Sequence, residues 1–196
     1  MSCLSTRFRG RLGLAALGLF VSMLFVAPAL GDLPGLRRVR SLQSLAYTID
    51  GVFGHYFQAD PDTGEFSLNL DRDENNSGSY WQFELVHRHR DYGRVYSLQQ
   101  RGNGVFNSWY LAVDEETQQL RLVPHRENWS SKWRIRYAGK HNGYDAFVVQ
   151  TVAELGTSDM KFLSLDPVTR RPQLSRELDD TGYWFLDVVS DLPTDF

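Results

Sequence analysis

The stretch YLAVDEETQQLRL at residues 110–122 has two similar stretches in the same chain, YFQADPDTGEFSL at 56–68 and FLSLDPVTRRPQL at 162–174. Each begins with an aromatic and an apolar residue, and then has an Asp at the fifth position, a Thr three residues later and a Leu five residues after the Thr. A Gln precedes and a Trp follows each stretch; these are Gln43, Gln99 and Gln150, and Trp81, Trp133 and Trp184. Because these residues recur in the same order about every 52 residues, they indicate one supersecondary unit that is present three times.

Within each unit apolar and polar residues alternate, which is the period of a β-strand. Trp81 and Phe83, for example, fall on one face of their segment, and Gln82 falls on the other. The D-x-x-T sequence predicts a hairpin turn, because the Asp carboxylate accepts backbone N–H groups and the Thr hydroxyl closes the turn. We therefore expect four short strands per unit and twelve in total, with the three repeated tryptophans buried in the core.

This pattern, with an aromatic residue opening the second strand of each unit and a Trp opening the fourth, resembles the β-trefoil superfamily from about Gln43 to Val189. The resemblance implies an all-β fold in which three hairpins cap a six-stranded barrel around a pseudo-threefold axis. Among β-trefoils the chain is similar to ricin-type lectins, with departures. Those repeats carry a Gln two residues before the Trp and an Asp that binds sugar; here the corresponding residues are Ser79, Ser131 and Gly182, and Gln58, Ala112 and Ser164.

The first 31 residues are expected to be a signal peptide, which predicts a secreted, extracellular or periplasmic protein. Three arginines precede an apolar run from Leu12 to Leu30, and Ala29-Leu30-Gly31 fits a cleavage site, with Ala27-Pro28-Ala29 as the alternative. An uncleaved transmembrane anchor is the other interpretation of this run. Residues 32–41 would then form an N-terminal extension, 42–190 the β-trefoil domain and 191–196 a C-terminal tail.

Composition excludes several classes of protein. The 196 residues are 42% hydrophobic and 23% charged, which is typical of one folded domain. The net charge is −3, or about −6 without the first 31 residues, and this argues against a nucleic-acid partner. Cys3 is the only cysteine, so the domain has neither disulfides nor thiolate chemistry. His87 and His89 share a strand face but lack a third ligand at motif spacing, and we expect no metal and no cofactor.

Trp109 and Trp129 have no counterpart in the other two units. A flat indole in a polar loop is suited to stack on a sugar ring, and Asn128 and Asp114 could bind hydroxyl groups beside it. We therefore predict a carbohydrate-binding site formed by Trp129, Asn128, Asp114 and Trp109. The alternative for both tryptophans is packing against the rim of the barrel.

The sequence thus predicts a non-enzymatic, lectin-like binding protein, because it contains no catalytic motif such as G-x-S-x-G. We expect a monomer whose partner is a glycan or a secreted or cell-surface protein, with no membrane contact after signal cleavage. The alternative function is a protein-binding trefoil such as a protease inhibitor, with Arg170-Arg171 or Arg88 to Arg90 in the reactive loop. Asn75 and Asn128 lie in N-glycosylation tripeptides, which carry glycans only in a eukaryotic host.

Overall fold

The computed structural model describes residues 39–46, 48–49, 52–53, 55–69, 78–90, 93–102, 104–127, 129–152 and 160–188. The expected signal peptide, the tail at 191–196, Asn75 and Asn128 lie outside these ranges. The first strand, β1 (Val39–Ser44), begins three residues before the predicted domain start at residue 42, and Arg40 and Ser41 are already buried. No helix within the described ranges is long and apolar enough to cross a membrane.

The predicted four strands per unit are confirmed. The first unit contains β1, β4 (Tyr56–Ala59), β5 (Phe66–Asn69) and β6 (Trp81–His89). The second contains β7 (Gly93–Gln100), β8 (Tyr110–Val113), β9 (Leu120–Val123) and β10 (Trp133–His141). The third contains β11 (Tyr144–Thr151), β12 (Phe162–Leu165), β13 (Pro172–Ser175) and β14 (Trp184–Val188), with a 3-10 turn η1 (Asp180–Gly182) before β14. A small additional hairpin of β2 (Thr48–Ile49) and β3 (Val52–Phe53) follows β1.

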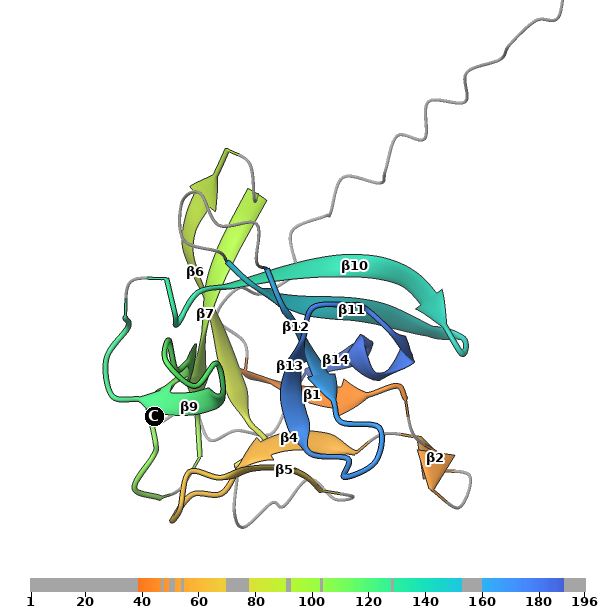
Figure 1. Ribbon diagram of the computed structural model, residues 1–196, viewed down its shortest axis with the longest axis horizontal. Helices are drawn as coiled ribbons and strands as arrows, with labels where there is room; N and C mark the ends of the chain where they lie inside the picture. Colours follow the sequence, from red (N-terminus) through yellow and green to blue (C-terminus); the bar gives the residue numbers. More distant parts are fainter. Residues whose placement is uncertain are drawn as a thin grey trace, which may run out of the picture.

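The first and fourth strands of the units close a six-stranded barrel. Antiparallel pairing runs from β1 to β6, β7, β10, β11 and β14, and β14 returns to β1. The second and third strands form the hairpins β4–β5, β8–β9 and β12–β13, which Figure 1 shows in orange, green and blue. This closure leaves each barrel strand paired on both sides and confirms the predicted architecture.

The repeated glutamines join each hairpin to the barrel. The backbone of Gln43, Gln99 and Gln150 pairs with the aromatic residue that opens the second strand of the same unit, respectively Tyr56, Tyr110 and Phe162. In the second unit the Gln99 side-chain amide also donates to the Tyr110 hydroxyl, at 3.1 Å. The Gln of the repeat therefore lies at the junction where the chain leaves the barrel wall.

The three repeated tryptophans are fully buried in one core, as predicted. Each indole Nε1 donates to a backbone carbonyl of its own unit's second strand, at 3.2 Å for Trp81 and 2.9 Å for Trp133 and Trp184. The acceptors are Phe57, Leu111 and Leu163. A Trp at this position fills the core and satisfies a carbonyl that would otherwise be buried without a partner.

The D-x-x-T turns also have the predicted structure. In each turn, Oδ1 of the Asp accepts hydrogen bonds from the backbone N–H groups two and three residues later. The accepting aspartates are Asp60, Asp114 and Asp166. The residue four after the Asp adopts a left-handed backbone, with φ of 72° at Gly64 and 58° at Gln118 and Arg170. The three hairpins therefore share one turn geometry although only one of them has a glycine there.

These turns should make the protein sensitive to acid. The pKa of the Asp in each turn is lowered, and the largest cause is the hydrogen bond from the backbone N–H of the Thr three residues later. These aspartates are Asp60, Asp114 and Asp166. A carboxylate with a lowered folded-state pKa stabilises the fold above its unfolded pKa of about 3.9, and this stabilisation is lost as the pH falls through the folded pKa. The triple variant D60N/D114N/D166N retains acceptor oxygens but no charge, so its melting temperature should be lower at pH 7 and should fall less between pH 5 and pH 3. The single variant D62N, which changes an exposed carboxylate in the first turn, is the control; an unchanged pH profile in the triple variant would contradict this account.

Candidate functional site

The loop that carries Trp129 connects β9 to β10 and is fixed to the hairpin of its own unit. The backbone N–H of Val113 at the end of β8 donates to the Ser130 carbonyl, at 2.9 Å. Within the loop, the Lys132 N–H donates to the Trp129 carbonyl, at 3.0 Å, and the Ser131 hydroxyl donates to the Glu127 carbonyl, at 2.8 Å. These hydrogen bonds anchor the loop at Glu127 and from Trp129 to Lys132.

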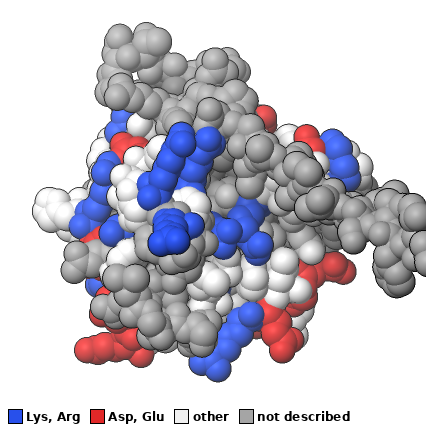
Figure 2. Space-filling view, turned by 90° about the horizontal axis from the view of Figure 1, so that it is seen from above, with Lys and Arg blue, Asp and Glu red and all other residues white. Residues whose placement is uncertain are grey.

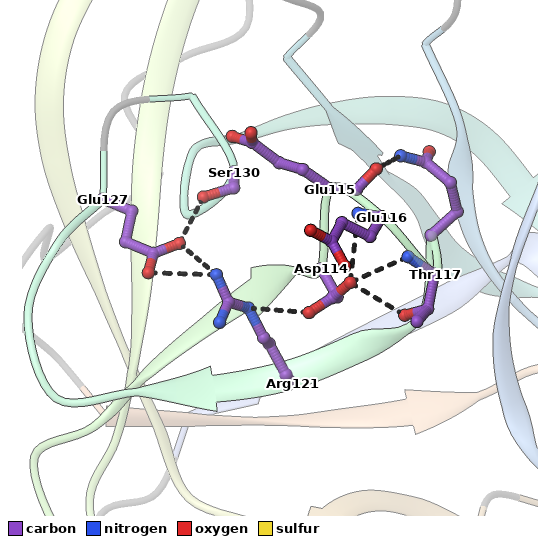
Figure 3. A network of polar contacts seen from close by, with 8 residues as sticks. Asp114, Glu115, Glu116, Thr117, Arg121, Glu127 and Ser130 are labelled. Carbon is purple, nitrogen blue, oxygen red and sulfur yellow. Dashed lines mark hydrogen bonds and ion pairs between the residues drawn. The ribbon is translucent and has the colours of Figure 1, made fainter.

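A polar network joins the same loop to the D-x-x-T turn of the second unit (Figure 3). Nη2 of Arg121 on β9 donates to both carboxylate oxygens of Glu127, at 2.8 and 3.0 Å. The Ser130 hydroxyl donates to Glu127, at 2.6 Å, and Arg121 Nε lies 3.8 Å from Asp114 Oδ2. Because Oδ1 of Asp114 accepts from Glu116 and Thr117, this carboxylate already has partners on both oxygens.

The Trp129 indole is half-buried and does not belong to the hydrophobic core cluster. Its edge-to-face neighbour is His87 of β6, with ring centroids 6.2 Å apart. The Lys132 ammonium lies 4.3 Å from the centre of the indole, at a distance typical of a cation–π contact. Trp129 thus bridges two units, since β6 belongs to the first and Lys132 to the second.

Positive charge gathers on one face of the molecule. Figure 2, seen from the top of Figure 1 where β6, β7 and β10 lie, shows Lys and Arg in the middle of the face. Arg88 and Arg90 are exposed beside the β6–β7 turn. On β10, the half-buried Arg134 and Arg136 alternate with buried apolar residues. Burial, followed by the charge of Arg136, lowers the pKa of the Arg134 guanidinium. The acidic net charge of the chain conceals this basic face.

Trp109 lies on a different surface of the second unit. Its ring packs edge-to-face on Phe106, with centroids 4.8 Å apart. The Phe106 ring in turn packs close to Gly64 in the first unit's turn, where an added Cβ would lie 3.0 Å from Phe106 Cζ. Trp109 therefore belongs to the contact between the loop at 104–109 and the neighbouring hairpin.

The predicted site residues are thus only partly brought together. The structure connects Asp114 to the loop of Trp129 through Arg121 and Glu127, whereas Trp109 packs on Phe106. Asn128 lies outside the described residues. Sequence reasoning missed the Arg121–Glu127–Ser130 network, His87 and Lys132. Within the described part of the chain no group of three His, Cys, Asp or Glu side chains is placed to hold a metal ion.

Five of the six positions at which the sequence departs from ricin-type lectins are buried. Ser79 and Ser131 are 1% and 0% exposed, and an added Cβ at Gly182 would lie 2.7 Å from Leu178 Cδ1. Ala112 and Ser164 are likewise inaccessible. A larger side chain would not fit at these five positions without a shift of its neighbours. The sixth position, Gln58, is half-buried, and its amide is hydrogen-bonded to Ser67 and Asn69.

Comparison with known proteins supports the fold. Neither a protein-family model nor a curated protein sequence matches the chain. Among solved structures it is similar to the designed threefold-symmetric protein ThreeFoil, at 13% identity and a TM-score of 0.54, over 76% of this chain and 99% of that one. It is also similar to SeviL bound to asialo-GM1 saccharide, at 10% identity and a TM-score of 0.53, over 76% of this chain and 96% of that one. The chain has a β-trefoil fold. An SDF2-like protein from Arabidopsis thaliana also matches, at 12% identity and a TM-score of 0.49, over 82% of this chain and 98% of that one.

For the alternative function, a protease inhibitor, the backbone of the Arg170-Arg171 loop is poorly suited to be the reactive loop. In this β-trefoil Arg170 has a φ of 58°, because it is the left-handed residue of the third hairpin turn. Peptides that bind by adding a strand to an enzyme are extended on both sides of the recognised residue. The Arg170-Arg171 pair is exposed but does not have this extended backbone.

Proposed function

We propose that this β-trefoil is a secreted, non-enzymatic carbohydrate-binding protein whose site centres on Trp129. The observation that carries the proposal is a half-buried indole held on an anchored loop outside the barrel core. The repeat does not require this Trp, whereas the three repeated tryptophans account for the core. An indole offers the flat apolar surface on which the C–H face of a sugar ring can stack.

Polar groups around Trp129 would complete the site. Lys132 Nζ is close enough to the indole to donate to an oxygen of a sugar stacked there. Its long flexible stem allows the ammonium to move from the ring face to a ligand oxygen. The adjacent Arg121–Glu127–Ser130 network holds the loop in place, so less ordering entropy is lost on binding. The similarity to SeviL, a structure determined with a bound saccharide, is consistent with this use of the fold but does not identify the ligand.

A glycan array that contains neutral and acidic glycans tests the function directly. We expect binding to a restricted set of glycans, reversed by excess free ligand, with a dissociation constant on the order of millimolar for a single sugar ring because the site is shallow. The double variant D60N/D166N is the matched control, because it changes only the hairpin turns of the first and third units and should bind glycans like the wild type. Absence of binding to every glycan by the folded protein would refute the proposal.

A further inference from the structure

The three hairpins surround a cavity of about 1000 Å³, here called the axial pocket. Its floor consists of apolar side chains of β5, β9 and β13 that also pack against the hydrophobic core. They are Phe66, Leu68, Leu120, Leu122 and Leu174. This volume is at the upper end of the range for pockets that hold small molecules. The floor is contributed by all three units and therefore exists only once the trefoil has closed.

Polar side chains line the upper part of the axial pocket. Arg170 and Arg171 enter it from the third hairpin turn, and Gln118, Gln119 and Gln173 add amide groups. Of the two carboxylates in the lining, Asp60 already accepts N–H groups of its own turn through Oδ1, and the other is Glu65. An apolar floor beneath guanidinium and amide groups is suited to a small polar ligand that carries an anionic group.

His55 is a further polar residue in the lining of the axial pocket. It is only 7% exposed, and its Nδ1 is buried with no hydrogen-bond partner among the described residues. Its carbonyl accepts the Ser44 N–H at 2.9 Å, which fixes the backbone from which the ring projects. Burial, followed by the charge of Arg170, lowers the pKa of His55 and so favours the neutral ring, which has one donor and one acceptor nitrogen. Because Nδ1 has almost no accessible surface, a ligand would meet the His55 ring at its other nitrogen, Nε2.

We propose that the axial pocket binds a small hydroxylated carboxylate, with the carboxylate on Arg171 and a polar oxygen of the ligand on His55. Acidic monosaccharides and hydroxy acids both have this chemistry. A planar guanidinium binds a carboxylate through two parallel hydrogen bonds, and the three Gln amides would bind hydroxyl groups. This site is separate from Trp129, which lies against β6, and it does not depend on the proposed function.

Titration calorimetry with D-glucuronate, D-glucose and lactate tests the proposal. We expect glucuronate to bind with a dissociation constant on the order of millimolar and glucose, which has the same ring without a carboxylate, to bind at least tenfold more weakly. Binding of lactate with similar affinity would support the site and point to hydroxy acids as its ligands; much weaker binding of lactate would support it and point to acidic sugars. If neither carboxylate binds, the proposal is wrong.

Variants separate the axial pocket from other cationic surfaces. R171Q and H55Q should weaken glucuronate binding at least tenfold, whereas R90Q, which removes the same charge from an exposed position beside the β6–β7 turn, should leave it unchanged. R171Q changes an exposed side chain, so the test remains valid even if replacement of buried His55 prevents folding. W129A should bind glucuronate normally, and loss of binding in W129A or R90Q but not in R171Q would overturn the assignment to the pocket.

Discussion

Replacing Trp133 by Ala should lower the free energy of unfolding by about 3–5 kcal/mol, the largest effect that we expect from any single substitution. The indole is fully buried at the centre of the second unit, and its removal leaves a cavity. It also leaves the Leu111 carbonyl without the donor that now lies 2.9 Å away. Equilibrium unfolding in guanidinium chloride measures the change.

The variant W133F separates these two contributions. Phe fills most of the cavity but provides no N–H donor, so W133F should be less stable than the wild type and more stable than W133A. W81A and W184A should behave like W133A, because the three indoles make equivalent hydrogen bonds. A denaturation midpoint in W133A equal to that of the wild type would place Trp133 at the surface and contradict the fold.

Replacing Trp129 by Ala should reduce glycan affinity at least tenfold while the protein stays folded. The stacking surface is lost, whereas the loop keeps the hydrogen bonds of Glu127, Ser130 and Ser131 and of its backbone. Retention on an immobilised glycan identified by the array, together with the thermal midpoint of the same sample, measures both properties.

Trp109 provides the matched control for this prediction. W109A removes an indole of similar exposure from the second unit, but its contact is with Phe106 on another surface. We expect W109A to retain glycan binding. If W109A loses binding and W129A does not, the glycan binds beside Trp109 and Phe106 rather than at Trp129. If W129A unfolds, its indole is a structural cover for β6, and the carbohydrate proposal fails.

The fold could be predicted because its determinants are repeated and local. The fixed spacing of Asp and Thr places a turn, and alternation assigns Trp81, Trp133 and Trp184 to the interior. The small β2–β3 hairpin was missed although Asp50-Gly51 between Ile49 and Val52 is a strong signal for a tight turn. Because this dipeptide occurs in only one of the three units, a comparison of the repeats does not detect it.

The candidate site was harder to predict because its members come from different units. His87 approaches Trp129 only after β6 and β10 have both paired with β7. The axial pocket likewise forms from strands that are distant in sequence, and no local pattern marks His55 as one of its residues. The basic face was hidden because a whole-chain charge sums over cations and carboxylates that the fold places apart.

The central claim, that a glycan binds at Trp129, is tested most directly by the indole N–H resonances of the five tryptophans. These are followed by NMR as the array-selected glycan is added, and W129F and W109F assign the two resonances that do not belong to the core. We expect the Trp129 resonance to shift in a saturable manner, while the resonances of Trp81, Trp133 and Trp184, which are hydrogen-bonded inside the core, stay in place. Saturable binding that leaves the Trp129 resonance unmoved would contradict glycan binding at Trp129.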